Sequence, residues 1–439
     1  MTTDATASQR AQFVRDQLPP QGLFAGQTWR ISPEAFPLSA ELVARLEGLG
    51  AHLLAFYRAC NVLYRHSVEG KLPPWIAQYL DAGKPKELIE FSRLGRFKGH
   101  VPRVIRPDVV LTDDHFFVAE LDSVPGGIGL TGWLGKTYAS LGDPIVGGAQ
   151  GMMEGFDAVL RAESKTDEPR ALVAVSDEAA TYRPEMEWLS QQIGFRVVRP
   201  EELSRIEKAT VVYRFFELFD LPNVPSVNAL MQAAAQGEVH VTPPFKPQLE
   251  EKMLFAFLWM EQLRAFWREH LGDKSVAVLR EVFPYTWIVD PAPLPPHAVI
   301  PELGIHDWRD MAEFSQKQRE LVLKISGFSD RAWGSRGVYV GHDLPSTEWA
   351  EAIDQALKSF AAHPFILQRF QKSKLFDAQY VDFEANEPRA FAARVRLCPY
   401  YFVVDDAAKL GGVLATICPA NKKILHGMPD AVMAPCHRQ

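Results

Sequence analysis

The sequence predicts a mixed α/β (α+β) protein in which a helical N-terminal region precedes strands and strand–helix units. Three observations support this prediction. Apolar residues recur at helical spacing through 38–64, and residues 101–123 alternate as strands do and are rich in β-branched and aromatic side chains. Residues 149–221 then alternate between helix-like and strand-like patterns, which is typical of parallel βαβ units.

The composition excludes several classes of protein. The formal net charge is −7 and there is no basic block, so we expect no nucleic-acid partner. The densest apolar run, at 253–260, is far shorter than the roughly 20 residues of a membrane span, and the N-terminus lacks the features of a signal peptide. The 4 cysteines are scattered without C-x-x-C spacing and fit reduced thiols. We therefore expect a cytoplasmic protein without a membrane partner.

We expect four consecutive regions, divided where the pattern changes or where proline-rich segments occur. Ser39 and Ser346 are expected to cap helices, and a helix apolar almost all round is expected at 249–271. The regions are a mainly helical N-terminal part at 1–100, a hairpin with a following loop at 101–148, a Rossmann-like α/β subdomain at 149–245, and a C-terminal region at 246–439.

The glycine-rich stretch AELDSVPGGIGLTGWLGKT at 119–137 ends like a P-loop, but its spacing does not fit. The pattern G-x-x-x-x-G-K-[ST] needs a glycine at Leu130, whereas the nearest glycine, Gly129, comes one residue too early. Glu120 and Asp122 would also bring negative charge close to a bound triphosphate. We therefore do not expect a P-loop here.

Charged residues gather in the predicted hairpin. Arg106 and Asp108 share one face of the first strand, and Glu120 and Asp122 share one face of the second. The register around the turn at 112–115 decides whether these faces coincide. A two-residue turn separates the two pairs, whereas a loop of odd length places Asp108 opposite Glu120 and Arg106 opposite Asp122.

Three carboxylates on one strand face repel one another unless a cation lies between them. Mg²⁺ prefers oxygen ligands and often lies between carboxylates and substrate phosphates. Asp108, Glu120 and Asp122 are therefore candidate metal ligands. The alternative is a solvated strand face on which Arg106 pairs with one of the acids.

A second group of residues indicates a nucleotide. Lys324 lies within an apolar strand pattern, directly before a glycine-rich loop at 327–341. An ammonium group that meets phosphates, beside a loop that covers them, suits a nucleotide; the alternative is a lysine that reaches solvent from an edge strand. Gln368 ends a later strand, where backbone and amide groups can hydrogen-bond an adenine edge.

The order of these features resembles the circularly permuted ATP-grasp ligases, and in particular the synthetase domain of glutathionylspermidine synthase. In that family an R-x-D strand is followed by an E-x-N strand. Here RPD at 106–108 and ELD at 120–122 match, although Asp122 stands where the family has asparagine. The family's N-K-A-type lysine is matched by Lys274, with Asp273 in place of asparagine.

The resemblance covers roughly residues 101–439 as spaced motifs. It implies an ATP-grasp-like, circularly permuted fold with its nucleotide-binding region at 246–439. It also implies an ATP- and Mg²⁺-dependent ligase that joins a small-molecule carboxylate to an amine, forming an amide or peptide bond through an acyl phosphate. The implied roles are Mg²⁺ binding by Asp108, Glu120 and Asp122, stabilisation of the transferring group by Arg106, and nucleotide binding by Lys274, Lys324, Gly334, Ser335, Gly337 and Gln368.

The same resemblance gives the glycine-rich stretch a second interpretation. Residues 126–127 would border the acceptor carboxylate, a helix from about Gly132 would offer N–H groups to it, and Lys136 would pair with an acidic substrate. A turn into a packed helix is the alternative. Arg394 and Arg396 share a strand face and are further candidates for anion binding.

Other functions fit the sequence less well. An inactive ATP-grasp-like protein that binds a nucleotide or a partner remains the main alternative, because Asp122, Asp273 and the long glycine loop depart from the family pattern. A serine hydrolase is disfavoured because GFSDR at 327–331 lacks the final glycine of G-x-S-x-G. A Rossmann oxidoreductase is disfavoured because G-x-G-x-x-G does not occur between a strand and a helix.

Overall fold

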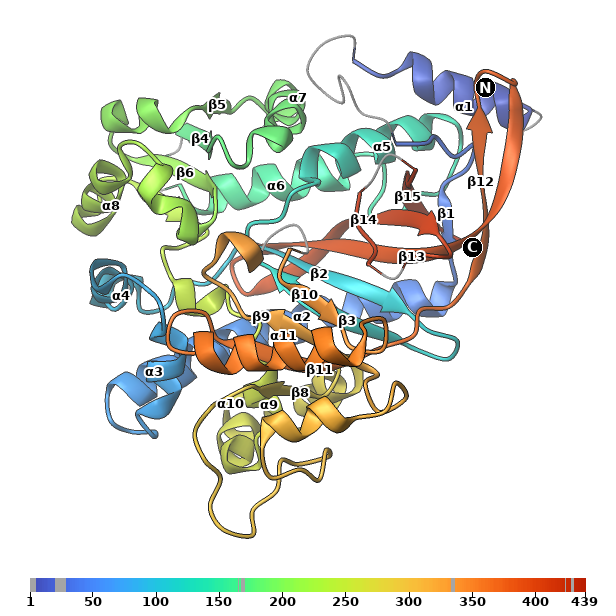
Figure 1. Cartoon of the computed structure of the whole chain (residues 1–439). Coiled ribbons are helices and arrows are strands. Elements are labelled where there is room, and N and C mark those ends of the chain that lie inside the picture. Colours follow the sequence, from blue (N-terminus) through green and yellow to red (C-terminus); the bar gives the residue numbers. More distant parts are fainter. Residues whose placement is uncertain are drawn as a thin grey trace. The chain divides into compact units, whose positions relative to one another are not determined.

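The structure is a computed structural model that describes residues 5–19, 29–164, 166, 170–332, 336–422, 424–427 and 430–439. The chain forms two compact units, each built from separate stretches of sequence (Figure 1). Unit 1 comprises Met1–Leu54, His100–Pro244 and Ser373–Gln439, and unit 2 comprises Ala55–Gly99 and Phe245–Lys372. This division differs from the four consecutive regions expected from the sequence, because the expected N-terminal and C-terminal regions each contribute to both units.

A seven-stranded sheet forms the centre of unit 1. Its order is β1-β15-β14-β13-β2-β3, and β12 also pairs with β13. Only the short pairing of β1 with β15 is parallel. The strands are β1 (Phe36–Leu38), β2 (Val104–Leu111), β3 (Phe116–Asp122), β12 (Phe376–Asp382), β13 (Glu387–Val404), β14 (Ala407–Pro419) and β15 (Val432–Arg438).

Helices cover both faces of this sheet within unit 1. Neighbouring residues of a strand point to opposite faces. Phe402 of β13 packs against Phe156 of α6 (Gly151–Ala162), with ring centroids 6.4 Å apart, and α5 (Ile128–Ser140) lies on the same side (Figure 1). Tyr401 points the other way and donates its hydroxyl to Leu46 O of α2 (Ala40–Val68) at 2.6 Å.

A smaller sheet in unit 1 confirms the predicted parallel βαβ units. Its order is β5-β4-β6-β7, and every pairing is parallel. All six residues of β6 are buried, as expected of the apolar run TVVYRF between helices. Its elements are β4 (Arg170–Val175), α7 (Arg183–Ile193), β5 (Arg196–Val198), β6 (Thr210–Phe215), α8 (Val227–Gln236) and β7 (His240–Thr242); α1 (Ala7–Asp16) also belongs to unit 1.

Unit 2 is built around a four-stranded antiparallel sheet of order β10-β9-β11-β8. One face packs Leu323, Leu367 and Trp287 against Trp349 and Ile353 of α11 to form its core. The elements are α3 (Trp75–Asp81), α4 (Lys86–Ser92), α9 (Leu254–Trp259), α10 (Arg264–Val282), β8 (Thr286–Ile288), β9 (Leu321–Ile325), β10 (Val338–Val340), α11 (Ser346–Ser359) and β11 (Phe365–Arg369).

Two expected helices differ in detail from the structure. The continuous helix expected at 249–271 is wrong: α9 ends at Trp259, because Met260 has extended backbone angles (φ −72°, ψ 119°). Ser346 is the first residue of α11 rather than its cap, and Pro345 precedes it. Ser39 does cap α2, since its Oγ accepts a hydrogen bond from Leu42 N at 3.2 Å. None of the helices in the described part of the chain has the length and apolar character needed to cross a membrane.

Candidate functional site

The hairpin has the register that brings its charged residues together. Arg106 lies opposite Asp122, and Asp108 lies opposite Glu120. A loop of odd length is not the cause, because the four residues 112–115 join the strands and Leu111 pairs with Phe116. A bulge between Asp108 and Val109 shifts the register instead, so Val109 lies opposite Val118.

Arg106 links the two aspartates of the hairpin. Its Nε lies 3.2 Å from Asp108 Oδ1, and its Nη2 lies 2.8 Å from Asp122 Oδ2. Its third nitrogen, Nη1, donates to Gly126 O at 3.2 Å. The Arg106 side chain is only 14% exposed, so this charge compensation takes place largely out of water. The alternative of Arg106 pairing with a single acid on a solvated face is therefore wrong.

The neighbouring strand β13 contributes a second guanidinium group. Arg396 Nη1 donates to Asp108 Oδ2 at 2.9 Å, and Cys398 Sγ lies 3.5 Å from Asp108 Oδ1. Burial works against the charge of Arg396, but the Asp108 carboxylate raises its pKa above the usual value. Arg396 Nε is buried without a hydrogen-bond partner among the described residues. The same holds for Arg106 Nε, which lies 3.2 Å from Asp108 Oδ1 but makes no hydrogen bond with the described residues, so each of the two guanidinium groups has one such nitrogen.

The donor set does not form a metal site in this arrangement. Repulsion among carboxylates was the reason to expect Mg²⁺. Here the positive charges of the Arg106 and Arg396 guanidinium groups reduce that repulsion. Within the described ranges, no three His, Cys, Asp or Glu side chains are grouped so that they could hold a metal ion. Metal binding by Asp108, Glu120 and Asp122 therefore stays a prediction without structural support.

The glycine-rich stretch turns directly into a helix. α5 begins at Ile128 rather than at about Gly132, and Gly127 precedes it with φ +90°, which favours glycine. The backbone N–H groups of Gly127 and Leu130 donate to the two carboxylate oxygens of Glu185, at 2.7 and 2.9 Å. The N–H groups expected to meet a substrate are thus bound by a side chain of α7.

Glu185 is a buried carboxyl group whose pKa is raised. Burial raises the pKa of Glu185 to about 7, although the two N–H donors act in the opposite direction. The carbonyl of Gly126, just before the helix, accepts from the Tyr400 hydroxyl at 2.7 Å as well as from Arg106. The turn before α5 and the charged hairpin therefore form one hydrogen-bonded cluster.

Two other predicted anion-binding residues are bound to protein groups. Lys136 Nζ donates to Gln192 Oε1 at 2.9 Å on the surface of α7. Arg394 donates from Nε to Ala420 O at 2.8 Å and from Nη1 to Ser373 O at 2.5 Å. Of the basic residues proposed for the substrate side, Arg106 and Arg396 join the hairpin cluster.

In unit 2, Lys324 belongs to a buried polar chain on one face of the sheet. Its Nζ donates to Gln368 Oε1 at 2.9 Å, and Gln368 Nε2 donates to Thr286 Oγ1 at 3.2 Å. Lys324 and Gln368 are 8% and 3% exposed. Because β9 lies between β10 and β11, the alternative of a lysine reaching solvent from an edge strand is wrong.

The remaining predicted nucleotide residues differ in their surroundings. Gly337 directly precedes β10, and its carbonyl accepts a hydrogen bond from Ile325 N at 3.2 Å. Lys274 lies on an exposed part of α10, after the break in helical geometry at Gly272. Gly334 and Ser335 lie outside the described residues. Lys252, which sequence reasoning missed, donates from Nζ to Ala332 O of the glycine-rich loop at 3.4 Å.

Several residues of these clusters, among them Glu185, Thr286 and Lys252, were not singled out from the sequence. Glu185 and Thr286 gave no signal, because a glutamate on a helix and a threonine in a strand are usual. Lys252 gave a weak one: the polar run EEK stands directly before the apolar run MLFAFLWM.

Comparison with known proteins identifies the class of fold. No family model and no curated protein matches the chain. The solved structure of a glutathione synthetase-like effector from Globodera pallida, in its apo form, matches with a TM-score of 0.56 and 12% identity, over 94% of this chain and 91% of that chain. A candidate gamma-glutamylcysteine synthetase from Methylobacillus flagellatus KT matches with a TM-score of 0.41 and 13% identity, over 90% of this chain and 88% of that chain.

The first match shows that the chain has a glutathione synthetase-like, mixed α/β fold. The second superposition is too loose to add to this conclusion. At such low identity the likeness extends to the fold and not to the roles of residues. Circular permutation and a relation to glutathionylspermidine synthase stay predictions.

Proposed function

We propose that the chain is an ATP-dependent carboxylate–amine ligase of the ATP-grasp type. The observation that supports this most directly is the Lys324–Gln368–Thr286 chain, a buried cationic and amide group on a sheet whose other face is apolar core. Burying such groups costs free energy, so a sheet that serves only to fold has little use for them. A nucleotide can satisfy both groups, because its phosphates accept hydrogen bonds from an ammonium group and its adenine edge pairs with an amide.

In this proposal unit 2 binds ATP. Lys324 and Lys252 neutralise phosphate charge, and Gln368 pairs with the base. Mg²⁺ enters as the counter-ion of ATP, and no resident metal is assigned to the hairpin. Phosphoryl transfer needs groups that position the reactants and neutralise charge more than it needs a protein nucleophile. The described residues of unit 2 provide groups of that kind.

The charged hairpin of unit 1 has guanidinium groups of the kind that can bind a carboxylate. The γ-phosphoryl group of ATP passes to the carboxylate oxygen, which gives ADP and an acyl phosphate. The amine then attacks the acyl carbon and releases inorganic phosphate. Arg396 is the better candidate for contact with the carboxylate or the acyl phosphate, because its ion pair is with one aspartate, whereas Arg106 pairs with two aspartates and also donates to Gly126 O. Arg106 holds the charged hairpin together and maintains the position of Arg396 through Asp108.

A second function is favoured by one specific observation. Both aspartates of the hairpin are paired with arginine, and the matched structure from Globodera pallida is described as an effector. A nucleotide-binding or interaction protein without ligase activity fits these facts. Both proposals include nucleotide binding, and only the first includes catalytic turnover of ATP.

Two measurements separate them. The first is the change in melting temperature with Mg²⁺ and ATP, since a ligand that binds only the folded state stabilises it by about 2.7 kcal/mol at a hundredfold excess over Kd. The second is phosphate release with mixtures of carboxylic acids and amines. Release that requires both an acid and an amine supports the ligase. A thermal shift without release supports the binding protein, and no shift with any nucleotide overturns both.

A Glu120→Ala variant tests the role of Glu120. If phosphate release is lost but the thermal shift is retained, Glu120 belongs to the reaction rather than to nucleotide binding.

A further inference from the structure

A buried ion pair in unit 2 is connected to the end of strand β9. Lys84 Nζ lies 2.5 Å from Glu251 Oε1, and the two side chains are 0% and 1% exposed. The other carboxylate oxygen of Glu251 accepts a hydrogen bond from Ser326 Oγ. Ser326 is fully buried and directly follows the last residue of β9, two residues after Lys324.

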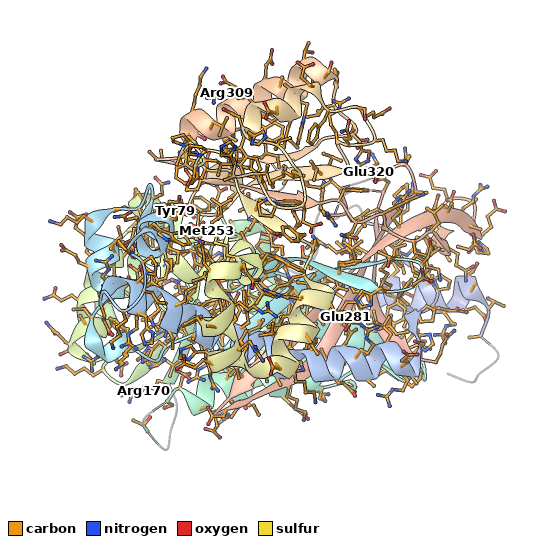
Figure 2. All side chains as sticks on the ribbon, turned by 90° about the horizontal axis from the view of Figure 1, so that it is seen from below. Tyr79, Arg170, Met253, Glu281, Arg309 and Glu320 are labelled. Atoms are coloured by element: carbon orange, nitrogen blue, oxygen red, sulfur yellow. The ribbon has the colours of Figure 1, made fainter. Side chains whose placement is uncertain are left out.

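The same serine holds the segment that contains Lys252. Ser326 O accepts from Lys252 N at 2.8 Å, and Ser326 Oγ accepts from Met253 N at 3.0 Å. Met253 is fully buried and is labelled in Figure 2. Residues 251–253 are therefore fixed to the end of β9 by three hydrogen bonds, and every one of them involves Ser326.

Close packing completes this arrangement. A Cβ atom at Gly327 would lie 2.8 Å from both Glu250 O and Glu251 Oε1, so a residue with a side chain does not fit there without displacement. The glycine-rich loop thus begins at a point that is fixed from two sides, by the β9 strand and by residues 250–251.

A buried ion pair contributes little net stability at this position. Two charges taken out of water lose more solvation than their attraction commonly returns, and well-packed apolar residues of similar volume are often as stable. What an ion pair of this kind provides is a defined position and a defined charge. Lys84 also neutralises Glu251, which would otherwise place a negative charge next to Lys252.

We propose that Lys84, Glu251 and Ser326 form a brace that positions Lys252 and Lys324 for the phosphates of ATP. This rests on the proposed function, because it assigns both lysines to the nucleotide. The three residues are positioning residues: they act through the two lysines and the start of the loop. Loss of the brace therefore weakens nucleotide binding by more than the accompanying loss of stability explains.

Ser67 offers a matched control for Ser326. It is a buried serine of unit 2 whose Oγ donates to Pro73 O at 2.6 Å and accepts from Ala77 N at 3.0 Å. Ser67→Ala and Ser326→Ala each remove one donated and one accepted hydrogen bond from a buried site. We expect similar decreases in melting temperature from the two substitutions.

The test is calorimetric titration of MgATP into the wild type and the variants. We expect Kd to rise at least tenfold in Ser326→Ala, which corresponds to 1.4 kcal/mol, and to change less than twofold in Ser67→Ala. Lys84→Met/Glu251→Leu removes the ion pair without leaving a buried charge, and we expect the same tenfold rise. Lys84→Met/Glu251→Gln restores an acceptor for Ser326 Oγ, so Kd should return to within threefold of the wild type.

The outcomes separate this proposal from the function on which it rests. Wild-type affinity in both Ser326→Ala and Lys84→Met/Glu251→Leu overturns the brace and leaves the nucleotide site standing. Equal weakening by Ser67→Ala also overturns it, since any loss of stability would then have the same effect. Failure of the wild type to bind MgATP overturns the proposed function itself, and the brace with it.

Discussion

The Nζ of Lys324 donates a hydrogen bond to Oε1 of Gln368 at 2.9 Å, so a cationic side chain and a neutral amide lie together on one buried face of the sheet. A hydrogen bond to a neutral amide does not itself cancel the charge of an ammonium group. This relationship is the centre of the proposed nucleotide site, and it defines the first prediction.

Lys324→Met is expected to abolish the thermal shift produced by MgATP. Methionine fills most of the lysine volume but has no charge, so the attraction for phosphate is lost. The Gln368 amide oxygen loses its donor, which costs about 1–3 kcal/mol of stability. Melting curves with and without MgATP measure both effects. Lys358→Met, on the exposed surface of α11, is the control and should keep the full shift. A full shift in Lys324→Met would remove Lys324 from the site.

Lys252→Met is expected to weaken MgATP binding more than Lys274→Met. Lys252 donates to a carbonyl of the glycine-rich loop, whereas Lys274 lies on an exposed stretch of α10. Calorimetric titration of the two variants should show at least a tenfold rise in Kd for Lys252→Met and less than a twofold rise for Lys274→Met. The reverse order would favour the assignment of Lys274 that the sequence motif predicts.

The sequence is sufficient to predict the longer strands and helices that have a clear pattern, because periodicity follows directly from which side chains are buried; short elements such as β1, β7 and β8 were not predicted. The hairpin strands, the turn at 112–115 and the parallel βαβ units follow from alternation and apolar runs. The register that places Arg106 opposite Asp122 was one of two possibilities, and the bulge that produces it left no mark in the sequence. The break at Met260 was missed because apolar residues continue across it.

The candidate site was less predictable, because its contacts join residues that are far apart in the chain. Arg396 reaches Asp108 across 288 positions, and Glu185 reaches Gly127 across 58. The sequence indicates that three carboxylates need a cation, but it does not indicate whether a metal ion or an arginine supplies the charge. Single residues without a motif, such as Glu185 and Ser326, are detected only when their neighbours in space are known.

Arg106→Met is expected to lower the free energy of unfolding by about 3 kcal/mol, because it removes the guanidinium group that pairs with the largely buried Asp108 and Asp122. Asp122→Asn is the comparison: it removes one charge but keeps one oxygen, which can accept either from Arg106 or from Val124 N. We expect it to cost less than about 1 kcal/mol. Urea unfolding at pH 7 measures both values. Equal losses would mean that Arg106 does not compensate the charge of the hairpin.

Glu185 is expected to make stability depend on pH. Its pKa is about 7 in the folded protein against the ordinary value of 4.5, so the folded state binds the proton more tightly. This group's contribution to stability is complete below about pH 4.5, declines as pH rises, and is lost above about pH 7. At 1.36 kcal/mol for each pH unit, the whole decline is about 3 kcal/mol.

Urea unfolding of Glu185→Gln between pH 5 and pH 8 tests this. The variant should lose about 2 kcal/mol less than the wild type over the rise from pH 5 to pH 7, whatever its stability at the starting pH. Glu187→Gln changes an exposed residue of the same helix and should follow the wild type. Parallel curves for all three proteins would show that Glu185 does not titrate in this range.

Two glycines of α5 are expected to respond in opposite directions to alanine. A Cβ at Gly129 would lie 2.1 Å from Glu185 O, a backbone atom of α7 that cannot move alone, whereas the nearest atom to a Cβ at Gly135 is Ile145 Cγ2 at 3.6 Å. Gly129→Ala should therefore lower the free energy of unfolding by about 3 kcal/mol through overpacking. Gly135→Ala should raise it by about 0.5–1 kcal/mol, because alanine favours the helix.

The same pair decides whether the glycine-rich stretch binds phosphate. In a P-loop, Gly135 would stand directly before the phosphate-binding lysine, and alanine there would disturb nucleotide binding. If the stretch only packs α5 against its neighbours, Gly135→Ala gains stability and keeps the thermal shift with MgATP. Urea midpoints and melting curves on the one variant give both results. If Gly135→Ala is more stable but shows no thermal shift with MgATP, the nucleotide-binding site should be assigned to this segment of unit 1.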